Sequence, residues 1–216
     1  MKTFVKLCGL KDPATVRLVP EGGAAGFVID VPTSPSNLSI AQAADLLAEV
    51  PTEAEAWAVV VSPSAELVHR LFDEVGVDRI QVYGSIPSEG LEFLEIHHLV
   101  PSLPIPGSGT DGPAPAIPPA EDYARLHLHS QGDPLADGLS ARPDWAMCAR
   151  LVDEQPGRKL VLSGGLTPES VGEAIATVHP WGLDVSAGVE SAPGTKDPAR
   201  IQAFLSAVLT AEKPAP

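Results

Sequence analysis

The chain has 216 residues and a formal net charge of −14, and these two values limit both its size and its partners. The length suits one hydrophobic core and is close to the roughly 250 residues of a (β/α)8 barrel. The acidic balance argues against a nucleic-acid partner, because proteins that neutralise phosphate backbones need a basic face. No apolar run approaches the roughly 20 residues of a membrane span, and the first residues do not resemble a signal peptide. We expect one cytoplasmic domain without membrane or nucleic-acid partners.

Short apolar runs alternate with helical patterns along the chain, which is typical of βα units around a parallel sheet. Helices are expected between the runs, and the first is marked by Asp12 as N-cap before Pro13. Eight such runs predict a (β/α)8 TIM barrel over residues 1–216, whose closure removes exposed edge strands. The runs predicted as strands are residues 4–8, 24–29, 56–61, 79–83, 93–99, 125–129, 159–162 and 183–185.

Residues 101–119 interrupt this alternation. They contain seven prolines and three glycines, a composition that disfavours a helix or a central strand. We therefore expect the fifth helix of the barrel to be missing and replaced by a Pro/Gly-rich surface loop, without a domain boundary. Residues 211–216 are expected to form a flexible tail.

The stretch from Leu160 to Asp197 carries the clearest functional signal. Two apolar runs within it end in glycine, at Gly164 and Gly165 and again at Gly188, and each precedes a helix start. Backbone N–H groups presented in this way bind phosphate, and a barrel brings the ends of neighbouring strands together. The stretch therefore predicts a phosphate site, although glycines also permit close packing of a helix on a strand.

Two side chains at predicted strand ends have useful chemistry. Cys8 ends the first strand, and its thiol can act as a base or nucleophile, although a lone buried cysteine is often only a core residue. His129 ends the sixth strand, and its imidazole titrates near neutrality. Cys8 and Cys148 do not have the spacing of a structural zinc site, and we expect no metal or other cofactor.

Five short motifs are distributed from one end of the chain to the other. They are Lys6-Leu7-Cys8-Gly9, residues 26–29 followed by Ser34-Pro35, residues 80–84, residues 162–171, and residues 184–190 with Pro193, Gly194, Lys196 and Asp197. In these motifs the sequence resembles the phosphoribosylanthranilate isomerase family of tryptophan biosynthesis. The last two are specific to that family in combination, whereas Lys-x-Cys-Gly alone is a weak signal.

The resemblance implies an Amadori rearrangement, in which an acid protonates the ribose ring oxygen and a base removes the C2 proton to give an enolamine. It implies Cys8 as the general base and a phosphorylated small molecule as the ligand. We expect the protein to be a monomer or a homodimer. The other residues implied by the resemblance are Gly164, Gly165, Ala187 and Gly188 in the phosphate-binding loops, Asp184 near the sugar hydroxyls, and Gln81 on the anthranilate side.

The rest of the predicted site departs from the family pattern. His129 replaces an aspartate general acid, and residues 131–140 replace a Gly-Gly-Thr-Gly loop. Ser36 or Asn37 stands where the family has an arginine for the anthranilate carboxylate, and Tyr83 replaces a histidine. Loss of a bidentate arginine weakens carboxylate recognition, by several kcal/mol in a dry site. We expect phosphate binding to be kept and carboxylate binding to be weakened.

Three hypotheses follow. The first is an isomerase with Cys8 as base and with His129, Asp133 or Asp137 as acid. The second is a barrel that binds a phosphorylated ligand or a partner without catalysing this reaction. The third is a metal-assisted barrel enzyme, because His127 and His129 share one face of their strand and could meet Cys8 and either His97 or His98.

Overall fold

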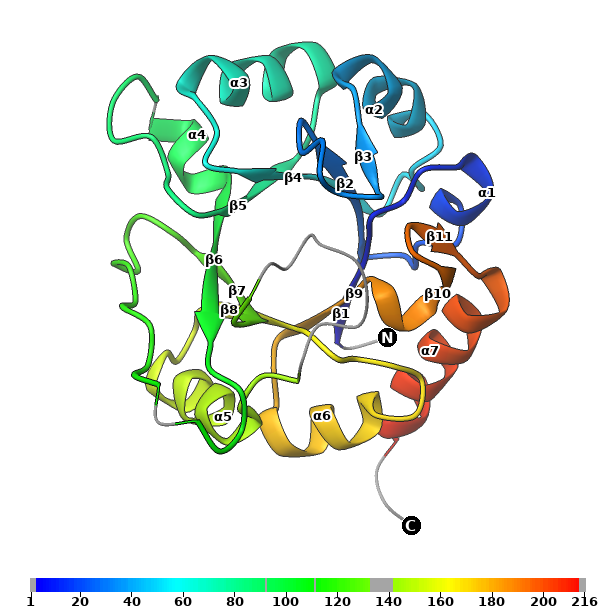
Figure 1. The fold of residues 1–216 in the computed structure, drawn as a ribbon, viewed down its shortest axis with the longest axis vertical. Coiled ribbons are helices and arrows are strands. Elements are labelled where there is room, and N and C mark those ends of the chain that lie inside the picture. Colours follow the sequence, from blue (N-terminus) through cyan, green and yellow to red (C-terminus); the bar gives the residue numbers. More distant parts are fainter. Residues whose placement is uncertain (1–2, 92, 111, 133–141, 214–216) are drawn as a thin grey trace.

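A closed barrel of eight parallel strands forms the centre of the computed structural model, which describes residues 3–91, 93–110, 112–132 and 142–213 (Figure 1). Strand β1 pairs in parallel with both β2 and β9, and this pairing closes the barrel. The predicted fold class is thereby confirmed. In chain order the barrel strands are β1 (Phe4–Cys8), β2 (Ala24–Ile29), β4 (Glu55–Val61), β5 (Arg79–Tyr83), β6 (Leu99–Ile105), β7 (Arg125–Ser130), β8 (Lys159–Ser163) and β9 (Gly182–Val185).

Helices surround the barrel (Figure 1), and several of them begin at a capping side chain. Asp12, Ser39, Ser64, Asp144 and Asp197 each accept a hydrogen bond from a backbone N–H of the first turn. These caps fix where the chain turns back along the sheet. The helices are α1 (Pro13–Val16), α2 (Ile40–Leu47), α3 (Ala65–Arg70) with its π-helical continuation η1 (Leu71–Val75), α4 (Phe93–His98), α5 (Trp145–Glu154), α6 (Val171–Val178) and α7 (Pro198–Ala211).

Four short elements lie beside the barrel, after strands β2 and β9. Strand β3 (Asn37–Leu38) pairs with β2. After β9 the chain forms a 3-10 turn, η2 (Ala187–Val189), and then a hairpin of β10 (Glu190–Ala192) and β11 (Thr195–Lys196). No helix in the described part of the chain is long and apolar enough to cross a membrane.

The prediction for the fifth strand was wrong. Residues 93–98 form helix α4, and the strand is β6, Leu99–Ile105, which includes Pro101 and Pro104. Proline lacks a backbone donor, but its φ remains within the β region, and every residue of β6 except Pro104 is buried. The described residues between β6 and β7, 106–110 and 112–124, contain no helix.

The lowest layer of the barrel interior closes the N-terminal end of the strands. Phe4, Ala24, Trp57, Val100 and Val161 form an apolar cluster there, and Trp181 packs against it. A partly buried ion pair completes this closed end: the Arg125 guanidinium donates to both carboxylate oxygens of Glu55, at 2.6 and 2.8 Å, and lies 4.9 Å from the ring centroid of Trp181.

Two further layers follow toward the C-terminal ends of the strands, because alternate residues of a strand point to the same face. The middle layer, called the polar layer below, consists of Lys6, Gln81, Ser102, His127 and Asp184, all of them buried. The top layer contains the cluster of Cys8, Val28, Val31, Val59 and Tyr83, together with His129. Polar groups buried beneath a layer of apolar side chains are costly unless they have partners or a function.

Candidate active site

Cys8 lies in the top layer at the end of β1, with 5% of its surface exposed. Burial raises the pKa of its thiol, and the nearby Lys6 ammonium opposes that increase. The structure thus places Cys8 where the barrel positions reactive groups, at the C-terminal end of a strand. The thiolate is the basic and nucleophilic form of cysteine, so the chemistry of Cys8 depends on the charges around it.

Asp184 is the centre of the polar layer. Its Oδ2 lies 3.0 Å from Nζ of Lys6 and 2.9 Å from Nε2 of His127. Burial alone would raise the pKa of this carboxyl, but the Lys6 charge and the His127 hydrogen bond lower it to about 2. Burial lowers the pKa of His127, so its neutral ring donates Nε2–H to Asp184. One ammonium, one carboxylate and one neutral imidazole are therefore held together inside the barrel.

Five atoms of the polar layer have no hydrogen-bond partner among the described protein atoms. They are Oε1 and Nε2 of Gln81, Oγ of Ser102, Nδ1 of His127 and Oδ1 of Asp184. Native proteins leave few buried polar atoms unpaired. Unpaired hydrogen-bonding atoms are therefore concentrated in the polar layer below Cys8. Gln81, which the resemblance places on the anthranilate side of the ligand, contributes two of them.

His129 lies beside the aromatic ring of Tyr83, with the ring centroids 4.9 Å apart in an edge-on arrangement. Its Nδ1 is 2.8 Å from the carbonyl oxygen of Ser130, and an N–H must occupy that position because a carbonyl only accepts. Burial lowers the pKa of His129 from 6.5 to about 4. At neutral pH its Nε2 therefore carries a lone pair and accepts hydrogen bonds.

We expect acid to destabilise the fold through His129. Between its ordinary pKa of 6.5 and its folded pKa of about 4, the unfolded chain binds a proton that the folded chain does not, so stability falls as the pH falls. The shift corresponds to about 3 kcal/mol. Urea unfolding of the parent and His129→Gln between about pH 7 and about pH 4 measures this contribution, since the variant should have a shallower slope of unfolding free energy against pH. Equal slopes would contradict the assignment.

The loops after β8 and β9 contact each other, as a phosphate site on two strands requires. A Cβ at Gly188 would lie 1.8 Å from the carbonyl oxygen of Leu166, so only glycine fits there. Gly164 and Gly165 have φ values of +97° and +64°, which glycine adopts without strain. Ala187 begins the turn η2 next to Gly188. The four residues predicted for phosphate binding thus come from adjoining loops.

Arg142 flanks the loop after β8. A Cβ at Gly165 would lie 3.2 Å from Cα of Arg142. The Arg142 guanidinium lies 3.3 Å from the ring centroid of Trp145 and donates to Glu173, with Nη2 2.9 Å from Oε1. The start of α5 is therefore packed against the predicted phosphate loop.

Ser36 lies close to Gly9, the residue that follows Cys8. A Cβ at Gly9 would be 2.8 Å from Oγ of Ser36 and 3.3 Å from Nζ of Lys196. Asn37 instead has a structural role, because its Oδ1 accepts from the backbone N–H of Val31 at 2.7 Å. Of the two candidates for the altered position, Ser36 is the one that lies next to Gly9.

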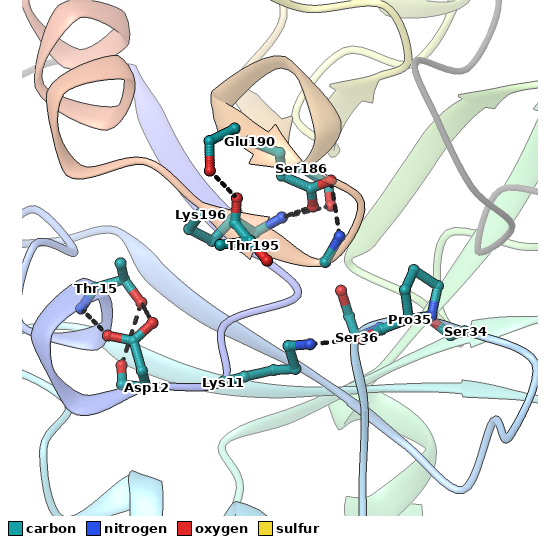
Figure 2. A network of polar contacts seen from close by, with 12 residues as sticks. Lys11, Asp12, Thr15, Ser34, Pro35, Ser36, Ser186, Glu190, Thr195 and Lys196 are labelled. Atoms are coloured by element: carbon teal, nitrogen blue, oxygen red, sulfur yellow. Dashed lines mark hydrogen bonds and ion pairs between the residues drawn. The ribbon is translucent and has the colours of Figure 1, made fainter.

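Two lysines lie near Ser36, and neither was predicted to have a role (Figure 2). Lys196 donates to Oγ of Ser186 at 3.0 Å and forms an ion pair with Glu190. Lys11 donates to the carbonyl oxygen of Pro35 at 2.6 Å. The motif around Gly194 and Lys196 marked this region, but the approach of β11 to Gly9 follows only from the fold.

The histidines proposed for a metal site do not meet. His97 and His98 end helix α4 and do not lie on a barrel strand; Nδ1 of His97 is 3.0 Å from the carbonyl oxygen of Asp122. Within the described ranges, no group of three or more His, Cys, Asp or Glu side chains is arranged to hold a metal ion. His127 is instead bonded to Asp184, one layer below His129. Asp133 and Asp137, the alternative acids, lie outside the described residues.

Comparisons with known proteins identify the family. The family model described as "N-(5'phosphoribosyl)anthranilate (PRA) isomerase" matches residues 5–207. The N-(5'-phosphoribosyl)anthranilate isomerase of Bordetella petrii is 35% identical, over 98% of this chain and 97% of the relative, and that of Afipia carboxidovorans is 34% identical, over 98% and 91%. The chain belongs to the phosphoribosylanthranilate isomerase family.

Solved structures of phosphoribosylanthranilate isomerases share the architecture. The enzyme from Thermotoga maritima superposes with a TM-score of 0.78 at 26% identity, covering 96% of this chain and 99% of that one. Another family structure, a complex with reduced 1-(o-carboxyphenylamino)-1-deoxyribulose 5-phosphate, has a TM-score of 0.75 at 25% identity, with 96% and 99% covered. The family members are isomerases that interconvert an aldose and a ketose.

Proposed function

We propose that this phosphoribosylanthranilate isomerase family member catalyses an Amadori rearrangement of a phosphoribosyl amine, and that Cys8 is its base. The observation that carries the proposal is the position of Cys8, which ends β1 above the Lys6–Asp184 pair, in the same barrel mouth as the loops of Gly164 and Gly188. The curated relatives are named for this reaction, and one solved relative binds a phosphorylated analogue.

The proposed reaction uses each part of the site once. The backbone of residues 164–165 and 187–188 binds the phosphate, while Oδ1 of Asp184 accepts hydrogen bonds from sugar hydroxyls. An acid protonates the ring oxygen and opens the ribose, and the Cys8 thiolate then removes the C2 proton to give the enolamine. His129, Asp133 and Asp137 are the candidate acids. A neutral His129 must first gain a proton from solvent or have its pKa raised by an anionic substrate.

The test is a steady-state assay with phosphoribosylanthranilate, together with calorimetric titration of ribose 5-phosphate. Turnover supports the proposal, and absence of both turnover and binding contradicts it.

The same assay identifies the acid. If protonated His129 acts in the free enzyme with the Cys8 thiolate, the loss of the His129 proton above about pH 4 offsets the gain of thiolate, so kcat/KM stays nearly level up to the pKa of Cys8. In His129→Gln the residual kcat/KM should instead rise about tenfold for each pH unit over that range, as the thiolate forms. If a loop aspartate acts instead, Asp133→Asn or Asp137→Asn lowers kcat by about 10²–10⁴, while His129→Gln retains most of the activity. Full activity in all three variants would remove every candidate.

A second function, binding of a phosphorylated ligand without this turnover, is favoured by one observation. Lys196, one of the two lysines near Ser36, is already paired with Glu190, so it offers little net charge to a substrate carboxylate. Under this alternative, Cys8→Ala would keep full biological activity in cells and ribose 5-phosphate would still bind. We place the protein in the cytoplasm as a monomer or homodimer; a Thermotoga maritima relative is described as dimeric, and light scattering measures the state here.

A further inference from the structure

The Lys6 side chain ends directly beneath Cys8, at a place that strand β2 leaves open. Gly26 of β2 is paired with Cys8 in the sheet. A Cβ at Gly26 would lie 2.9 Å from both Cε and Nζ of Lys6 and 3.0 Å from Cα of Cys8. The ammonium therefore occupies the volume that a side chain at position 26 would take, and it is completely shielded from solvent.

A fully buried lysine needs a partner, because the charged form is strongly disfavoured in an apolar interior. Asp184 supplies it at 3.0 Å, and His127 holds the same carboxylate oxygen at 2.9 Å. With a neutral His127, the three groups together have no net charge. This arrangement keeps the Lys6 ammonium beside the Cys8 thiol, while the carboxylate that balances its charge, Asp184, belongs to strand β9.

We propose that Lys6 is a positioning residue for catalysis: its buried ammonium, held by Asp184, stabilises the thiolate form of Cys8 from below. The proposal rests on the proposed function in taking Cys8 as the base, and it explains how a thiol in an apolar layer supplies a thiolate. Opposite charges within a few ångströms favour the charged form of each other. Lys6 therefore interacts with both the proposed base, Cys8, and Asp184, the carboxylate proposed to bind the sugar hydroxyls.

Among the described charged groups around Cys8, Lys6 favours the thiolate most strongly. Strand β2 presents Gly26 and Val28, which do not titrate. From β9, Asp184 disfavours the thiolate, and Lys196 of β11 favours it less than Lys6 does. The β7 imidazoles, His127 and His129, are neutral near pH 7, and burial keeps the Tyr83 phenol of β5 protonated because it raises its pKa.

The experiment measures the pKa of Cys8 in two variants that should shift it in opposite directions. Lys6→Met removes the charge and keeps the length of the side chain, so the pKa of Cys8 should rise by at least about one unit, a roughly tenfold loss of thiolate at a fixed pH. Asp184→Asn removes the opposing carboxylate and keeps a hydrogen-bond acceptor, so the pKa should fall. General damage to the site has no reason to produce opposite shifts.

The measurement follows the alkylation rate of Cys8 by iodoacetamide against pH, read by mass spectrometry, in a Cys148→Ala background. The ultraviolet absorbance of the thiolate gives a second reading that does not depend on access of the reagent. Neither requires turnover, so the result is independent of whether the proposed reaction occurs.

Shifts in the same direction, or none, would overturn the proposal. If Lys6→Met does not fold, the double variant Lys6→Met/Asp184→Asn, which leaves no unpaired buried charge, is compared with Asp184→Asn: a higher pKa of Cys8 in the double variant supports the proposal, and an equal or lower one rejects it.

Discussion

Replacing Cys8 with alanine is expected to lower kcat/KM by about 10²–10⁴, the usual contribution of a positioned general base. Cys8 ends β1 in the top layer, and Asp184 in the polar layer beneath is already bonded to Lys6 and His127. With a pKa of about 2, the Asp184 carboxylate is too weak a base to take the C2 proton in place of the thiolate. A steady-state assay on phosphoribosylanthranilate measures the loss, and calorimetry with ribose 5-phosphate should show binding preserved, because the phosphate loops do not involve Cys8.

Cys148 provides the matched control. It is the other cysteine of the chain and is completely buried in α5, where burial raises the pKa of its thiol to about 12. Cys148→Ala should therefore leave kcat/KM close to that of the parent. Near-parental turnover in Cys8→Ala would remove Cys8 from the mechanism.

Gly188→Ala is expected to weaken phosphate binding and to destabilise the fold. The new Cβ would lie 1.8 Å from the carbonyl oxygen of Leu166 and 3.2 Å from Cα of Thr167, both backbone atoms, so the loops after β8 and β9 must move apart. Overpacking of this kind costs about 1–3 kcal/mol. If this strain arises in the ligand-bound state, affinity for ribose 5-phosphate drops by a factor of about 5 to 150. Calorimetry measures the affinity, and urea unfolding measures the loss of stability.

Gly172→Ala is the control for that substitution. Gly172 lies in α6, and a Cβ there would approach only the Cβ of Ala211, at 4.0 Å. Alanine is the better helix former by about 1 kcal/mol, so this variant should be at least as stable as the parent and bind phosphate equally. Unchanged phosphate affinity in Gly188→Ala would show that the two loops do not act as one site.

The two glycine-ended loops of the predicted phosphate site could be located at strand ends because their signal is local. Gly164 and Gly165 follow an apolar run directly, and a short motif is sufficient to place them at a strand end. The fifth strand could not be placed in the same way, because short apolar runs fit a helix or a strand equally well and Pro101 and Pro104 pointed away from a strand. Burial in the assembled barrel decided the outcome.

The polar layer illustrates what the sequence does not contain. Lys6, His127 and Asp184 are distributed over three strands, and their contact depends on the register between β1, β9, β8 and β7. Likewise, the absence of a side chain at Gly26 acquires its meaning only once Lys6 is seen to fill that volume. Patterns along a strand predicted which face each residue occupies, but not which residues share a layer.

The positions of the three tryptophans make intrinsic fluorescence useful for following ligand binding in this barrel. Trp57 and Trp181 belong to the closed end, far along the strands from the phosphate loops. Trp145 instead lies under the Arg142 guanidinium, and the Arg142 backbone adjoins Gly165. In a protein whose other two tryptophans have been changed to phenylalanine, we expect the fluorescence emission of Trp145 to change when a ligand occupies the predicted phosphate site. No attached dye is then needed.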